Sequence, residues 1–92
     1  MDDSKFKFEI VEHVGTIKVQ PSGWYKEINL VSWNGTPAKY DLREWSPDHT
    51  MMSRGITLSE KEMVKAMNII LNKKPEIKKV MEAEKAARNQ ER

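Results

Sequence analysis

The chain of 92 residues has the length of one small domain with a thin hydrophobic core, and 33% of its residues are charged. Its formal net charge is only +2, and residues 1–56 hold seven basic against eight acidic side chains, so nucleic-acid binding would depend on a local surface and not on a basic protein as a whole. The absence of cysteine excludes disulfides and thiolate metal sites, and no apolar run has the roughly 18 residues of a membrane-spanning helix.

The first predicted strand begins at Phe6. Phe6, Phe8 and Ile10 alternate with charged side chains, which is the pattern of a half-buried strand. Gly15 interrupts the run where the parity of the apolar positions changes, so we expect a bulge or a bend there. A Pro-Ser-Gly turn at residues 21–23 predicts the end of this strand.

The stretch from Trp24 to Trp45 contains all three tryptophans and predicts a hairpin of two strands. Its strand-like runs surround Asn34-Gly35, the strongest short-range hairpin signal. Successive side chains of a strand point to opposite faces, so the alternation predicts one apolar face and one mixed face. The apolar face, which we expect to be the core layer, holds Ile28, Leu30, Tyr40 and Leu42. The mixed face holds Asn29, Trp33, Lys39, Arg43 and Trp45.

The mixed face combines flat aromatic rings with cationic side chains. Single-stranded nucleic acid needs both, because its bases stack on aromatic rings and its phosphates attract charges. Two other interpretations remain open. The tryptophans are half-buried packing residues among solvated charges, or the face grips an extended peptide or a partner sheet.

A short strand and a helix complete the predicted domain. The strand covers residues 54–58, and Ser59-Glu60-Lys61-Glu62 forms a capping box that predicts the start of the helix. The apolar residues that follow cover about 220° of the helix, more than the ~100° needed to pack on one sheet. We therefore expect a homodimer with the helix at the interface, and the alternative is a helix buried between its own sheet and the last segment. The expected interface residues are Met63, Val64, Met67, Ile70 and Leu71.

Pro75 divides the C-terminal region into two parts. We expect a nucleic-acid-binding domain over residues 1–74 and a helical extension over residues 75–92. The apolar stripe of the extension ends at Glu84, so we expect fraying beyond about residue 83.

The sequence contains no recognisable catalytic or metal-ligating pattern. His13 and His49 lie on different predicted elements, with no nucleophile or matching ligand at a suitable spacing. Asp41, Glu44 and Asp48 do not have the spacing of a calcium loop. We therefore expect neither an enzyme nor a metal site or cofactor.

Three segments resemble the single-stranded-DNA-binding domain of the transcriptional coactivator positive cofactor four, and particularly its short bacterial and phage relatives. They are KEINLVSW at residues 26–33, YDLREW at 40–45 and SRGITLS at 53–59. The resemblance covers about residues 6–72. It implies an α+β fold, with a four-stranded curved antiparallel sheet and a C-terminal helix through which two chains dimerise.

The resemblance also implies binding of single-stranded DNA with little sequence preference, in transcription regulation or in replication and repair. By position, Trp33 and Trp45 would stack bases, and Lys26, Lys39, Arg43 and Arg54 would lie near phosphates. The full expected set is Lys18, Trp24, Lys26, Asn29, Trp33, Lys39, Arg43, Trp45 and Arg54. Single-stranded RNA is left open as a ligand, and the transcription machinery as a partner. The expected location is the cytoplasm, at the nucleoid if the source is a bacterium.

Overall fold

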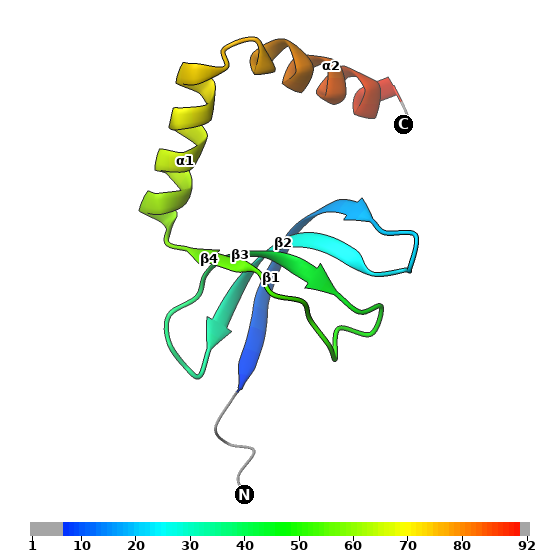
Figure 1. Cartoon of the computed structure of the whole chain (residues 1–92), viewed down its shortest axis with the longest axis vertical. Coiled ribbons are helices and arrows are strands. Elements are labelled where there is room, and N and C mark those ends of the chain that lie inside the picture. The colour runs from blue at the N-terminus through cyan, green and yellow to red at the C-terminus, as the bar shows by residue number, and fades with distance from the viewer. Residues whose placement is uncertain (1–6, 91–92) are drawn as a thin grey trace, which may run out of the picture. The chain divides into compact units, whose positions relative to one another are not determined.

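The computed structural model describes residues 7–90, and the side chains of residues 7–88. The elements follow one another as β1 (Phe8–Val19), β2 (Tyr25–Trp33), β3 (Lys39–Trp45), β4 (Ile56–Leu58), α1 (Glu60–Lys73) and α2 (Ile77–Gln90) (Figure 1). The predicted α+β class, with a four-stranded antiparallel sheet before a C-terminal helix, is confirmed. The chain forms two compact units that meet in the sequence between Glu60 and Lys61.

The sheet is a meander in which each strand pairs with the next in the order β1-β2-β3-β4. β1 is irregular, with register shifts between Ile10 and Glu12, between His13 and Gly15, and at Thr16/Lys18. The bulge predicted at Gly15 is therefore confirmed, whereas Phe6 lies outside the described residues. Bulges bend a strand and increase its twist, so these shifts mark the places where β1 bends.

The turn between β2 and β3 is held by local hydrogen bonds, and the predicted Asn-Gly hairpin is confirmed. Asn34 and Gly35 have φ values of 54° and 80°, which are favourable for these two residue types. The carbonyl of Trp33 accepts hydrogen bonds from the amide of Thr36 at 3.0 Å and from its hydroxyl at 2.7 Å. This turn therefore fixes the backbone of Trp33 at the end of β2.

The two faces of the sheet differ in burial. Trp33 and Trp45 lie on the same side of the sheet, because β2 and β3 pair in a register that puts Tyr25 opposite Trp45 and Val31 opposite Lys39. We call this side the tryptophan face. All the buried residues of β2 and β3 lie on this face. They are Glu27, Asn29, Val31, Asp41 and Trp45.

The predicted core layer is wrong for the described chain. Ile28, Leu30, Tyr40 and Leu42 lie together on the opposite face, as the alternation predicts, but they are only half-buried. The deepest burial is on the tryptophan face because side chains from outside the hairpin cover Trp45. The rings of Phe8 and His49 lie 5.3 Å and 5.7 Å from the Trp45 ring.

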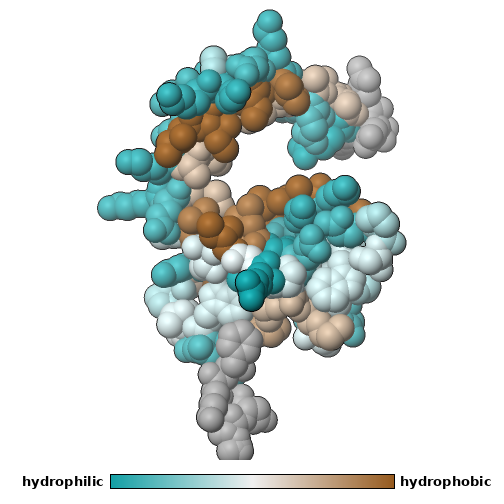
Figure 2. Space-filling view, in the orientation of Figure 1, coloured by the Kyte–Doolittle hydropathy of each residue, from teal (hydrophilic) through white to brown (hydrophobic). Residues whose placement is uncertain are grey.

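The helical unit begins as the capping box predicts, with Glu60 directly after Ser59. α1 ends at Lys73, Pro75 follows, and α2 runs to Gln90, well past the end of the apolar stripe at Glu84. Figure 2 shows apolar side chains along one side of the first part of α2 and hydrophilic side chains on the other side. No helix within residues 7–90 is long and apolar enough to cross a membrane.

Candidate nucleic-acid interface

A surface hollow of about 490 Å³ lies beside Trp33, near the turn between β2 and β3. We call it the Trp33 hollow, and its lining residues are Trp33, Asn34, Thr36, Lys39, Arg43 and Thr57. The structure thus brings together Trp33, Lys39 and Arg43 of the predicted set. Their placement follows from strand alternation, since all three side chains belong to the same face of the hairpin.

Lys39 is the exposed cation of the Trp33 hollow. It begins β3 opposite Val31, and among the described side chains no acidic residue lies within ion-pair distance of it. A lysine in this position carries its charge into solvent at low cost. An anionic group that enters the hollow would meet this charge.

Arg43 is in a different state, because its guanidinium is bound within the protein. Its Nε and Nη2 atoms donate to the two carboxylate oxygens of Asp41 at 2.7 Å each. Its Nη1 atom donates to the carbonyl of Ser53 at 3.2 Å, and only 13% of the side chain is exposed. The guanidinium carbon lies over the Trp33 ring, 4.7 Å from its centroid.

Trp45 and Asn29 belong to the tryptophan face but not to its surface. Both are fully buried. Asn29 donates to Glu27 Oε1 at 2.9 Å, and its Oδ1 atom lies 2.7 Å from His13 Nδ1. A base does not reach the Trp45 ring unless Phe8 or His49 moves, so the contacts to the strand that were expected of Trp45 and Asn29 do not fit the described arrangement.

The other expected basic residues lie on the opposite face of the sheet. Lys18 and Lys26 are register partners there, and Glu44 faces Lys26 from β3. Lys26 and Arg54 contribute to the lining of a second hollow of about 200 Å³. Trp24 is half-buried, directly before β2. The predicted set is therefore divided between two surfaces.

A cluster around Glu27 was not predicted from the sequence. Glu27 is 4% exposed, and its two carboxylate oxygens each lie 3.1 Å from His49 Nε2. His13 Nδ1 lies 3.6 Å from the same carboxylate. Alternation places Glu27 on this face, but the positions of the histidines depend on the bulges of β1 and on the loop after β3. No group of three or more His, Asp or Glu side chains within residues 7–88 is arranged to hold a metal ion.

The loop after β3 holds His49 over the sheet. His49 has a φ of 60°, and its ring is stacked on Tyr25 at 6.2 Å and on Trp45 at 5.7 Å. Asp48 Oδ1 accepts hydrogen bonds from the Thr50 hydroxyl at 2.7 Å, the Thr50 amide at 3.1 Å and the Ser46 hydroxyl at 2.9 Å. These bonds, the Thr50 hydroxyl first, lower the pKa of Asp48 below its ordinary value of 3.8.

Comparison with known proteins identifies the family. Residues 21–68, more than half of the chain, match the family described as Transcriptional Coactivator p15 (PC4). The chain belongs to the PC4 family. An uncharacterized protein of Treponema pallidum (strain Nichols) is 43% identical over 67 residues, which cover 73% of this chain and 78% of that protein.

The segment that matches the PC4 family includes the whole Trp33 hollow. It contains β2, β3 and β4 and ends within α1, whereas β1 and α2 lie outside it. The resemblance stated from the three sequence segments is thereby confirmed. The sheet hairpin, and not the helical extension, is the part of this chain that the PC4 family describes.

The residues expected at a dimer interface lie on α1 and are accessible. Val64, Met67 and Ile70 are 44%, 50% and 47% exposed, and Met63 and Leu71 are half-buried. A small apolar hollow of about 180 Å³ is lined by Met67, Ile70, Leu71, Ile77 and Met81.

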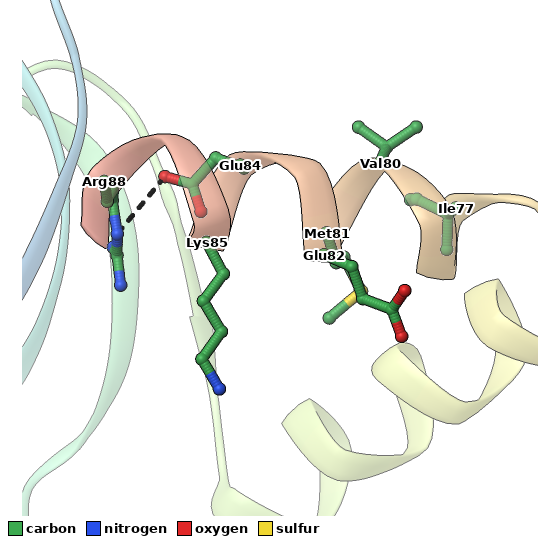
Figure 3. Close-up of a pocket in the computed structure, with 7 residues that line it drawn as sticks. All are labelled: Ile77, Val80, Met81, Glu82, Glu84, Lys85 and Arg88. Atoms are coloured by element: carbon green, nitrogen blue, oxygen red, sulfur yellow. Dashed lines mark ion pairs between the residues drawn. The ribbon is translucent and has the colours of Figure 1, made fainter. Parts of the chain in front are cut away.

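A larger hollow of about 570 Å³ lies along α2, where Glu84 and Arg88 form an ion pair at 3.6 Å (Figure 3). Its lining residues are Ile77, Val80, Met81, Glu82, Glu84, Lys85 and Arg88. The apolar members of this lining thus lie in the first turns of α2, and the charged members follow them along the helix.

Proposed function

We propose that this chain is a homodimeric single-stranded-DNA-binding protein with little sequence preference. The observation that carries the proposal is the Trp33 hollow, where a half-buried indole and an exposed lysine border a space large enough for a nucleotide, within the segment that matches the PC4 family. Trp33 stacks a base and Lys39 attracts a phosphate. Neither contact reads a base edge, so neither distinguishes one sequence from another.

The proposed binding site extends over both surfaces that carry the predicted residues. Lys18, Trp24, Lys26 and Arg54 form a second group of proposed contacts to the strand. Lys18 and Lys26 lie on the face opposite to Trp33, and Arg54 lines a hollow together with Lys26. Residues 1–74 form the binding domain and residues 75–92 a helical extension. Each stacked base contributes about 1–3 kcal/mol, so a few rings and phosphate contacts suffice for micromolar binding.

The proposal includes a dimer and a setting in the cell. The exposed apolar side chains of α1 support the interface proposed at Met63, Val64, Met67, Ile70 and Leu71. We place the protein in the cytoplasm of a bacterium, at the nucleoid, with the transcription machinery as a partner in transcription regulation. Replication or repair of DNA would require the same binding activity.

The test is a fluorescence-anisotropy titration of labelled oligo-dT of about 20 nucleotides, compared with a duplex of equal length. We expect binding that favours the single strand and weakens between about 50 and 200 mM salt. Trp33→Ala should weaken binding about tenfold, because a stacked base is lost. Lys39→Gln should reduce the log–log slope with salt by about 0.7, because one phosphate contact is lost. No binding to either oligonucleotide would overturn the proposal.

A protein-interaction module is the second candidate. Exposed apolar side chains along β1 favour it, since Val11, Val14 and Ile17 are 55%, 48% and 52% exposed. This function predicts weak and salt-insensitive binding to oligonucleotides. The same titration therefore distinguishes the two candidates.

A further inference from the structure

We propose that Arg43 and Asp41 position the ring of Trp33, and that the charge of Arg43 is not itself a main contact to the strand. The inference rests on the proposed function, because Trp33 is the ring on which a base would stack. It assigns Arg43 a role different from the phosphate contact that the family resemblance implies.

Asp41 is a fixed anchor in the centre of the sheet. It is fully buried, at a position of β3 that pairs with Asn29 of β2 and Thr57 of β4. Its Oδ1 atom accepts a hydrogen bond from the Thr57 hydroxyl at 3.1 Å, in addition to the two bonds from Arg43. A buried carboxylate requires such partners, and the bidentate pair fixes the plane of the guanidinium.

Arg43 has few donors left for a phosphate. Of its five N–H groups, those on Nε and Nη2 that face Asp41 are used, and Nη1 faces the Ser53 carbonyl and the Met52 sulfur at 3.4 Å. Its positive charge is compensated by Asp41 at 2.7 Å. Lys39 is exposed at the same hollow and has neither restriction.

The fixed guanidinium forms a platform for the indole. A planar cation over an aromatic face is attracted by the ring quadrupole, and the attraction is larger when the cation is desolvated. Here the guanidinium carbon is 4.7 Å from the ring centroid, and the ring of Phe8 lies 5.9 Å from Trp33 on a tilted plane. The guanidinium covers one face of the Trp33 ring, so a base that stacks on Trp33 must use the opposite face.

Gly55 completes this arrangement by allowing a close approach of the backbone. A Cβ atom added at Gly55 would clash with Cβ of Arg43 and with the carbonyl of Leu42, and would lie 2.9 Å from Arg43 Nε. The glycine of the SRGITLS segment is therefore required by sterics. It lets the chain before β4 pass directly against Arg43.

Asp41→Asn gives the sharpest test, because the two roles of Arg43 predict effects of opposite sign. If Asp41 positions Trp33 through Arg43, the substitution loosens the ring and weakens oligo-dT binding about tenfold, close to the effect of Trp33→Ala. If Arg43 binds a phosphate, the substitution removes a competing anion and strengthens binding. Glu12→Gln, which removes the same charge at an exposed position of β1, is the matched control and should leave binding nearly unchanged.

Two further variants separate position from charge. Arg43→Lys keeps the charge but loses the planar, bidentate geometry, so it should weaken binding by a similar factor and leave the salt slope at the wild-type value. In the Trp33→Ala background, Asp41→Asn should have no further effect, because its influence acts through the ring. Additive effects, or a slope reduced by Arg43→Lys, would overturn the inference.

A measurement on the free protein keeps this test independent of the proposed function. With 5-fluorotryptophan at the three tryptophans, Asp41→Asn and Arg43→Lys should shift or broaden the Trp33 fluorine resonance and leave that of Trp24 in place. Movement of all resonances would indicate unfolding, in which case Thr57→Val, which removes one bond to Asp41, replaces Asp41→Asn. An unmoved Trp33 resonance in the variants overturns the positioning role. A Trp33 resonance that moves in the variants, together with wild-type protein that binds no DNA, overturns the proposed function alone.

Discussion

Several polar side chains are buried on the tryptophan face, and each has a hydrogen-bond partner within the sheet or its loops. Glu27 is the clearest case, because its carboxylate lies at 4% exposure between Asn29 and His49. His49 Nε2 lies 3.1 Å from both carboxylate oxygens, and the Asn29 side-chain amide donates to Oε1 at 2.9 Å. The side chains of Asn29 and His49 thus both depend on the carboxylate of Glu27 for these contacts.

Glu27→Gln should reduce the free energy of unfolding by about 1–3 kcal/mol, because it replaces one of the two carboxylate oxygens beside Asn29 and His49 with an NH2 group, which cannot accept a hydrogen bond. Urea denaturation followed by circular dichroism measures the change. Glu9→Gln, at an exposed position of β1, is the control and should stay within about 0.5 kcal/mol of the wild type. Equal stability of the two variants would show that the Glu27 cluster does not contribute to folding.

At the scale of elements, the segment before β4 packs closely against β3 at Gly55. A substitution at this glycine tests the packing. Gly55→Ala should lower the free energy of unfolding by about 1–3 kcal/mol, because its methyl group would overlap Arg43 and the Leu42 carbonyl. Gly15→Ala is a matched control in the same sheet, since nothing lies within 4 Å of a Cβ atom there. Thermal unfolding that is equal for both variants would contradict this steric explanation.

The elements that follow from local chemistry were the predictable ones. The Asn34-Gly35 turn, the bulge at Gly15 and the start of α1 after Ser59 depend on residues within a few positions of each other. Alternation also placed Trp33, Lys39 and Arg43 on one face. The burial of Trp45 was not predictable, because Phe8 covers it from the other end of the sheet sequence and His49 covers it only through the fold of the loop after β3.

The roles of individual site residues were not predictable for a different reason, because they depend on side-chain conformation. Arg43 and Lys39 are equivalent cations in the sequence pattern, and only the pairing of Arg43 with Asp41 distinguishes them. Strand alternation placed Asp41 and Arg43 on one side of β3. It gave no reason to expect that the guanidinium would turn toward Asp41 and lie over Trp33, because a side-chain conformation depends on all of its neighbours.

At the scale of the whole molecule, the proposed dimer would carry two Trp33 hollows. Single-stranded DNA long enough to occupy both hollows would bind the second one with an effective concentration set by their separation. The affinity should therefore rise more steeply with the length of the DNA than the number of contacts alone explains. The interface proposed on α1 is apolar and exposed, with Ile70 at 47%. A charge at this position would be desolvated in the dimer and should prevent association.

Ile70→Glu should therefore yield a monomer of 10.7 kDa, whereas the wild type should have about twice this mass by size-exclusion chromatography with light scattering. The variant should bind a short oligo-dT as the wild type does and lose the extra affinity for long oligonucleotides, which we expect to be at least about tenfold. Asn68→Glu, at an exposed polar position of α1, controls for the added charge. A wild-type monomer would refute the dimer, and a monomeric variant that kept the length dependence would show that one chain holds the strand along both of its faces.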